Sequence, residues 1–175
     1  FKNIDFIYVG RVDKRKGVDL IIHASYILKK QGLEPKIIII GDGLYLDYCK
    51  RLVSKLRLNN IEFLGYLKEK EKVYEYILKA KFFIMPSFYE GDPIIVKEVL
   101  SLGVPVIASN ILALRQLIRD GINGFLFKEG NYLDLADKMK KALSITENDY
   151  IVMLRNALNS VSKCSCTNVA EELLS

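Results

Sequence analysis

The sequence predicts an α/β protein: a Rossmann-like, doubly wound parallel sheet of six strands with helices on both faces. Short runs of apolar residues alternate along the chain with longer segments in which apolar residues recur at helical spacing. The apolar runs lack the polar alternation of a half-exposed strand, so we expect parallel strands that are buried on both faces. Right-handed crossovers between these strands follow from the chirality of the chain.

The expected elements follow one another as pairs of strand and helix. Gly10 ends the first apolar run, and Gly32 ends the first helical segment. Strands are expected at 4–9, 36–40, 61–64, 82–85, 104–108 and 125–127. Helices are expected at 18–28, 44–56, 68–78, 94–102, 112–118 and 132–143, and two further helical segments at 150–161 and 168–174. No low-complexity linker interrupts this alternation, so we expect residues 1–175 to form one domain.

The composition excludes several classes of protein. The 175 residues are 50% hydrophobic and carry a net charge of +5, which suits an anionic ligand, a nucleic acid or an anionic membrane surface. The positive charges are scattered over helical segments without a nucleic-acid-binding motif, so we expect no nucleic acid as a partner. No apolar run approaches the roughly 20 residues of a membrane span, and the first residues do not have the layout of a signal peptide.

The cysteines and the histidine offer no metal or disulfide framework. The three cysteines are Cys49, Cys164 and Cys166, and the one histidine is His23. They lack the spacing of a zinc site, and an odd number of cysteines favours a reducing compartment. We therefore expect a cytoplasmic protein, with Cys164 and Cys166 as packing residues and His23 as a structural residue of the first helix.

Two carboxylates at E-x7-E spacing are the most informative feature of the chain. Glu90 lies just past the fourth expected strand, and Glu98 lies in the helix that follows Pro93. In that helix, Glu98 lies on or beside the apolar face formed by Ile94, Ile95, Val99 and Leu102, which is expected to be buried. A buried carboxylate is costly unless hydroxyls, amides or a cation surround it. The pattern therefore indicates a polyhydroxylated ligand at the carboxyl ends of the strands.

The loop after the first strand combines glycines and cations. Gly10 and Gly17 bound a segment that contains Arg11 and Lys16 and opens a helix. Glycines allow close approach to the backbone, a helix N-terminus offers N–H groups, and arginine pairs with phosphoryl oxygens. A phosphate site and a solvated run of charges both fit this loop. It lacks the Lys-Ser/Thr ending of a Walker A motif.

The next two loops carry weaker signals. Gly41-Asp42-Gly43 fits a tight turn between strand and helix better than a dinucleotide fingerprint, because a third glycine is missing. After the third strand, Gly65, Tyr66 and Leu67 offer backbone groups and one aromatic ring. Tyr66 could stack on a base, although tyrosines more often pack in the core or lie on the surface.

Taken in order, these spaced motifs resemble one family. The sequence looks like the C-terminal domain of a retaining group 1 (family 4) glycosyltransferase with the GT-B fold, and the resemblance covers nearly the whole chain. It rests on Gly10-Arg11, Lys16-Gly17, residues 41–43, 63–66 and 86–91, Glu98, and residues 103–109 and 120–124.

The resemblance implies a role for each motif residue. Arg11 and Lys16 match the cations that hold the diphosphate of the donor, and Glu98 matches the glutamate that accepts hydrogen bonds from its ribose. Glu90 matches the glutamate that faces the transferred sugar, and is the expected catalytic residue. The loops expected along the base or the sugar contain Gly65, Tyr66, Leu67, Gly91, Asp92 and Pro93. The family uses no metal, and we expect no cofactor.

The resemblance also implies partners. The donor is a nucleoside diphosphate sugar, and the expected reaction is the retaining transfer of a hexose to a glycan or a lipid-linked acceptor. The acceptor binds a separate N-terminal domain that is absent from this sequence, so the isolated fragment is expected to bind the donor without turnover. Membrane association, at the inner face, would run through the missing domain. The motifs do not select the base, the sugar or the acceptor.

Two departures from the family pattern leave alternatives open. Asp92-Pro93 replaces a common Phe-Gly pair, and Leu112-Ala113 stands where a Gly-Gly pair is usual. Side chains at Leu112 and Ala113 would crowd the approach of a donor to the backbone. The alternatives are a nucleotide-sugar 2-epimerase of related architecture and a non-catalytic module of the same fold.

Overall fold

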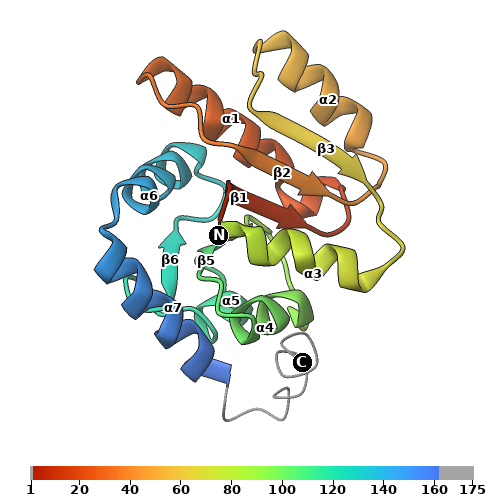
Figure 1. Ribbon diagram of the computed structural model, residues 1–175. Helices are drawn as coiled ribbons and strands as arrows, with labels where there is room; N and C mark the ends of the chain where they lie inside the picture. Colours follow the sequence, from red (N-terminus) through yellow and green to blue (C-terminus); the bar gives the residue numbers. More distant parts are fainter. Residues whose placement is uncertain (1, 162–175) are drawn as a thin grey trace.

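Six parallel strands form the central sheet, in the order β3-β2-β1-β4-β5-β6 (Figure 1). The computed structural model describes residues 2–161. The strands are β1 (Ile4–Val9), β2 (Ile37–Ile40), β3 (Ile61–Gly65), β4 (Ala80–Met85), β5 (Val106–Ser109) and β6 (Gly124–Phe127). Because β1 pairs with both β2 and β4, the direction of winding reverses there, and the predicted doubly wound, Rossmann-like fold is confirmed.

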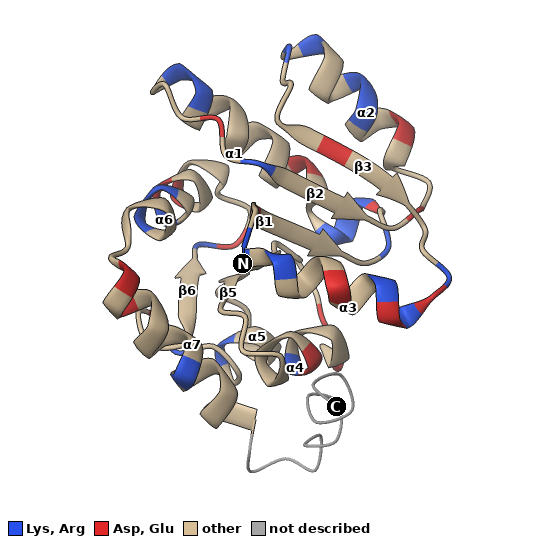
Figure 2. Ribbon diagram, viewed as in Figure 1, with Lys and Arg blue, Asp and Glu red and all other residues tan. Residues whose placement is uncertain are grey.

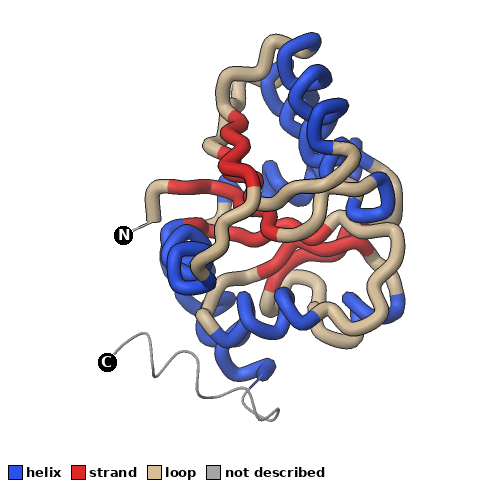
Figure 3. Tube along the Cα trace, turned by 90° about the vertical axis from the view of Figure 1, so that its right-hand side faces the viewer, coloured by secondary structure: helices blue, strands red, loops and turns tan. Residues whose placement is uncertain are grey.

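Helices cover both faces of the sheet, and Figure 3 shows the strands between them. The helices are α1 (Val18–Lys30), α2 (Leu46–Lys55), α3 (Lys70–Lys79), α4 (Ile94–Ser101), α5 (Leu112–Arg115), α6 (Tyr132–Ser144) and α7 (Glu147–Val161). Helix α1 packs against α2 and α6, and α4 packs against α7. A short 3-10 helix, η1 (Lys14–Lys16), precedes α1 and was not predicted. The helical segment expected at 168–174 and the packing role of Cys164 and Cys166 lie outside the described residues.

Buried side chains of the sheet and of the helices packed on it form the core. Two sequence-based expectations about burial are wrong. Strands β2 and β5 are buried at every residue, but β3 is only partly buried because it lies at the edge of the sheet. On α4, Val96, Val99 and Leu100 face the core, whereas Ile94 is 59% exposed. The buried stripe of α4 is thus rotated from the predicted one, and Glu98 lies beside it.

The loops at the carboxyl ends of β1, β2 and β3 are joined by backbone hydrogen bonds. The Gly10 N–H donates to the Ile40 carbonyl at 3.0 Å, and the Gly41 N–H donates to the Gly65 carbonyl at 2.8 Å. A Cβ atom at Gly41 would lie 1.7 Å from the Gly10 oxygen, and the φ of Gly41 is 141°. Only glycine fits this position, so these three strand ends form one fixed edge.

Charges are mixed over the surface of the described residues. Figure 2 shows lysines and arginines as well as acidic residues along α2 and α3. No helix among residues 2–161 combines the length and the apolar character that crossing a membrane requires. Within the same residues, histidine, cysteine and carboxylate side chains do not gather in a group that could hold a metal ion.

Candidate functional site

The loop after β1 folds into a capped turn against the loop after β4. Asp13 caps η1, because its Oδ1 accepts hydrogen bonds from the Arg15 N–H at 3.0 Å and the Lys16 N–H at 3.2 Å. Gly17 follows with a φ of 72°, and a Cβ there would lie 2.2 Å from the Pro86 carbonyl oxygen. The Asp13 cap and the Gly17 contact therefore fix the position of Lys16 relative to the β4 loop.

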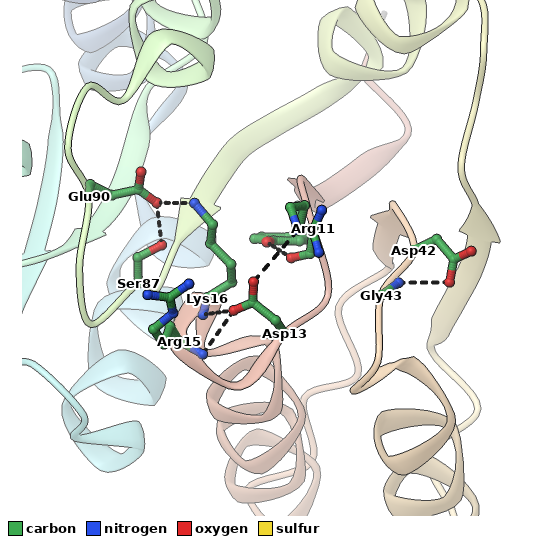
Figure 4. A network of polar contacts seen from close by, with 9 residues as sticks. Arg11, Asp13, Arg15, Lys16, Asp42, Gly43, Ser87 and Glu90 are labelled. Carbon is green, nitrogen blue, oxygen red and sulfur yellow. Dashed lines mark hydrogen bonds and ion pairs between the residues drawn. The ribbon is translucent and has the colours of Figure 1, made fainter.

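Lys16 and Glu90 form an ion pair between these two loops (Figure 4). The Lys16 Nζ lies 2.8 Å from the Glu90 Oε1, and the Ser87 hydroxyl donates to the same oxygen at 2.7 Å. The Glu90 side chain is only 7% exposed and that of Lys16 is 27% exposed. The structure thus brings together two of the predicted site residues and adds Ser87, which lies three residues before Glu90 and received no role from the sequence.

Arg11 is placed differently from Lys16. Its side chain is 75% exposed, and its Nε lies 3.8 Å from Asp13 Oδ2, too far for a hydrogen bond. The backbone below it is anchored, because the hydroxyl of the fully buried Tyr8 donates to the Arg11 carbonyl at 2.6 Å. Burial raises the pKa of Tyr8, and the negative charges of Glu90 and Asp13 add to the effect. Tyr8 therefore remains a hydrogen-bond donor near neutral pH while the Arg11 side chain extends into solvent.

Glu98 has a cationic partner that the sequence did not indicate. Its side chain is 17% exposed, and its Oε1 lies 2.8 Å from the Nζ of Lys70, the first residue of α3. The predicted need of this carboxylate for polar partners is thus met by a lysine in another helix. Lys70 itself is 64% exposed, and an exposed lysine gives no sign of its partner in a sequence.

A cavity of about 370 Å³ lies beside the first three strand ends. Tyr66 and Leu67, two residues of the loop that the resemblance places along the base, line it, and Tyr66 is 73% exposed. The other lining residues are Val9, Gly10, Arg11, Ile40, Gly41, Asp42 and Val73. Gly65 does not line the cavity, but its carbonyl oxygen accepts the hydrogen bond from Gly41. The lining combines apolar side chains, backbone, one cation and one carboxylate, a composition typical of a ligand site.

The remaining predicted loop residues lie between β4 and α4, where Pro93 is buried. Gly91 and Asp92 are exposed, and the Asp92 Oδ1 lies 2.7 Å from the Lys97 Nζ. Pro93 is the residue before the first turn of α4. Leu112, which departs from the family pattern, is 62% exposed at the start of α5. Its side chain therefore extends from the carboxyl end of β5 into solvent.

These features define a class of protein: a Rossmann-like α/β domain of the kind found in GT-B glycosyltransferases, with its polar groups at the carboxyl ends of the strands. The family described as "Glycosyl transferases group 1" matches residues 2–157. The chain belongs to this family.

Individual relatives agree with this assignment. An uncharacterised glycosyltransferase of Methanocaldococcus jannaschii is 30% identical over 141 residues, which cover 81% of this chain and 38% of the relative. The structure of a TarM mutant of S. aureus, solved with fondaparinux, α-GlcNAc-glycerol and UDP, superposes with a TM-score of 0.85 at 22% identity, covering 99% of this chain and 35% of that one.

A solved structure of a C-terminal domain also matches. This domain of a group 1 glycosyltransferase, LpcC of Francisella tularensis, has a TM-score of 0.80 at 23% identity, and the match covers 91% of this chain and 85% of that one. By contrast, the chain spans well under half the length of the curated relatives that it matches, such as 38% of the archaeal protein. The predicted resemblance to the C-terminal domain of a group 1 glycosyltransferase is confirmed.

Proposed function

We propose that this chain is the donor-binding domain of a retaining glycosyltransferase and that it binds a nucleoside diphosphate sugar. The observation that carries the proposal is the Lys16–Glu90 pair, which lies where the loops after β1 and β4 meet. An ammonium group that suits a phosphate and a carboxylate that suits sugar hydroxyls are held there 2.8 Å apart. A donor whose diphosphate and sugar are neighbours can contact both groups.

The diphosphate would bind Lys16 and Arg11. A lysine ammonium has three N–H donors, so Lys16 can keep its bond to Glu90 while it donates to a phosphoryl oxygen. The exposed guanidinium of Arg11 can move onto the same group, because its 3.8 Å contact with Asp13 holds it only weakly. Gly17 keeps this loop packed against the β4 loop, because a Cβ there would lie 2.2 Å from the Pro86 carbonyl oxygen.

The other parts of the donor fit the remaining features. Glu98 would accept hydrogen bonds from the ribose, and the cavity of about 370 Å³ beside Tyr66 and Leu67 would hold the base. The sugar would lie near Glu90 and the loop of Gly91, Asp92 and Pro93. UDP in the TarM crystal structure supports a nucleotide ligand for this fold.

In the proposed reaction, the bond between the anomeric carbon and the diphosphate oxygen breaks. The oxygen of an acceptor hydroxyl bonds to that carbon on the same face, and the hydroxyl proton passes to the departing diphosphate. The charges of Lys16 and Arg11 offset the charge that develops on the diphosphate, so we propose that neither a metal nor a cofactor takes part. Glu90 would orient the hexose.

The complete reaction would need a second domain. We propose that the missing N-terminal domain binds a glycan or lipid-linked acceptor, and that it provides any contact with the cytoplasmic face of a membrane. Residues 1–175 alone would then bind the donor without turnover, because catalysis requires both substrates in a fixed geometry.

The described site favours a transferase over the epimerase alternative. An epimerase of related architecture is expected to use several acid and base groups. His23 packs its ring against Tyr132 between α1 and α6, with centroids 5.1 Å apart, and this contact agrees with the predicted structural role. A non-catalytic module of the same fold, suggested by Leu112 and Ala113, would be distinguished by the loss of diphosphate binding.

Calorimetric titration with UDP, GDP and ADP tests the proposal. Arg11→Ala/Lys16→Ala should weaken the binding of the preferred diphosphate at least about tenfold, since each charged hydrogen bond is worth roughly that factor or more. Lys14→Ala/Arg15→Ala removes the same charge from exposed positions of the same loop and should change affinity no more than about threefold at 0.15 M salt, because exposed charges are screened. Binding that is absent at millimolar concentration, or equally weak in both variants, would refute the proposal.

A further inference from the structure

An ion pair joins the start of α3 to the middle of α4. The Lys70 Nζ donates to the Glu98 Oε1 at 2.8 Å, across 28 residues of sequence. No motif contains Lys70, and the donor-binding proposal gives it no role. The pair nevertheless holds the carboxylate that the proposed function assigns to the ribose.

The position of Lys70 is not explained by the stability of its helix. A cation in the first turn of a helix is disfavoured by the helix dipole, and the preceding residue, Glu69, makes no capping hydrogen bond through its side chain. Lys70 is also 64% exposed, and ion pairs of such exposure contribute little to folding. The effect of Lys70 therefore falls mainly on Glu98, whose side chain it fixes in one orientation.

Tyr74, one turn further along α3, completes the cluster. The Lys70 Nζ lies 5.4 Å from the centroid of the Tyr74 ring, so the ammonium group is held between an aromatic face and a carboxylate. Tyr74 is 6% exposed, and its buried hydroxyl oxygen lies near Lys70 and Glu98 without a hydrogen bond of normal geometry to either. Burial raises the pKa of Tyr74; the interaction with Lys70 opposes this rise and the charge of Glu98 adds to it.

The Tyr74 hydroxyl is closed off from solvent, whereas the Lys70 ammonium group is 64% exposed and the Glu98 side chain is 17% exposed. Hydroxyl groups of a ligand can therefore reach the Glu98 carboxylate but not the Tyr74 oxygen. A carboxylate oxygen that takes one hydrogen bond from Lys70 can accept a second. The ion pair therefore leaves Glu98 able to receive hydroxyl donors while it restricts the directions from which they arrive.

We propose that Lys70 is a positioning residue that holds Glu98 for the ribose hydroxyls of the donor, and thereby sets the preference of the site for ribonucleotides over 2′-deoxyribonucleotides. This inference rests on the proposed function. Lys70 acts through Glu98, and the donor need not touch it.

The test is the ratio of two affinities on the same chain. Calorimetry gives the Kd values of UDP, GDP and ADP and of their 2′-deoxy analogues for the wild type, Lys70→Met, Lys70→Arg and Lys72→Met. Lys72 is exposed two residues further along the same helix, so Lys72→Met removes the same charge without touching Glu98. A general structural defect would weaken both ligands of a pair equally, whereas loss of positioning weakens the ribonucleotide more than its deoxy analogue, which has only the 3′ hydroxyl to offer Glu98.

For the preferred base, we expect the wild type to bind the ribonucleotide about tenfold more tightly than its deoxy analogue, as a charged hydrogen bond allows. Lys70→Met should reduce this ratio to about threefold or less, because the ribonucleotide loses more affinity than the deoxy compound, while Lys70→Arg and Lys72→Met keep it. A ratio that is unchanged or larger in Lys70→Met overturns this inference, while the proposed function as a donor-binding domain still stands. Failure of every nucleotide to bind the wild type would overturn the proposed function and this inference together.

Discussion

The ion pair between Lys16 and Glu90 predicts a loss of stability when the ammonium group is removed. Lys16→Met keeps the aliphatic stem but leaves the Glu90 carboxylate, which is 7% exposed, with the Ser87 hydroxyl as its remaining partner among the described residues. A charge that is withdrawn from water and has lost its cation is strongly unfavourable. The variant should therefore unfold more easily even without a ligand.

The burial of the two side chains sets the size of the effect. Removing one member of a fully buried ion pair typically costs about 3–5 kcal/mol, whereas exposed pairs contribute about 0.2–1 kcal/mol. Because Lys16 is 27% exposed, water can reach its end of the pair. We therefore expect Lys16→Met to lower the free energy of unfolding by about 2 kcal/mol, within the usual range for a hydrogen bond to a charged group.

Urea unfolding followed by circular dichroism measures this loss. With a slope of about 2 kcal/mol per M, the midpoint should fall by about 1 M while the slope stays constant. Lys14→Met, at an exposed position of the same turn, should stay within about 0.5 kcal/mol of the wild type. The double variant Lys16→Met/Glu90→Gln should lose less stability than the sum of the losses in Lys16→Met and Glu90→Gln, because the two residues interact directly. Exact additivity, or a Lys16→Met midpoint equal to that of the wild type, would refute the reasoning.

Two further predictions concern the fold. Gly41→Ala should cost more than about 4 kcal/mol of stability, or prevent folding, because its Cβ would lie 1.7 Å from a backbone oxygen. Gly91→Ala is the control, because a Cβ at Gly91 would have its nearest neighbouring atom 3.9 Å away. A urea midpoint of Gly91→Ala as low as that of Gly41→Ala would contradict the account. Burial raises the pKa of Cys49 to about 12, so at pH 8 its thiolate is scarce. With Cys164→Ser and Cys166→Ser as background, a thiol reagent should label Cys49 only as fast as the protein opens, and immediate labelling in native buffer would show this to be wrong.

Most of the fold follows from local sequence patterns. Parallel strands buried on both faces give unbroken apolar runs, so residues 37–40 and 106–109 are visible as strands. The start of β4 is hidden because Lys81 is exposed within it, and the predicted strand begins only at Phe82. The expected helix at 112–118 ends at Arg115, although backbone hydrogen bonds from Leu117 and Ile118 to the Leu114 carbonyl continue it as a turn. The Asn123 side chain then bonds the backbone of Leu117 and of Arg119 and closes the loop that follows.

The candidate site was predictable in its residue types but not in its pairings. Glycines and cations after β1, and the spacing of Glu90 and Glu98, indicated phosphate and hydroxyl chemistry from sequence alone. The pairing of Lys16 with Glu90 joins residues 74 apart, which follows only once β1 and β4 are known to be neighbours. Lys70 was missed because exposed lysines are common on helices and its partner lies in a different helix.

A crystal structure of the chain with the nucleoside diphosphate that it binds most tightly would test the central claim most directly. The account predicts the diphosphate within hydrogen-bonding distance of the Lys16 Nζ and close to the backbone of Gly17, the ribose hydroxyls on Glu98, and the base in the cavity beside Tyr66. A nucleotide bound elsewhere on the fold, with Lys16 still engaged only by Glu90 and Ser87, would contradict the donor-site assignment.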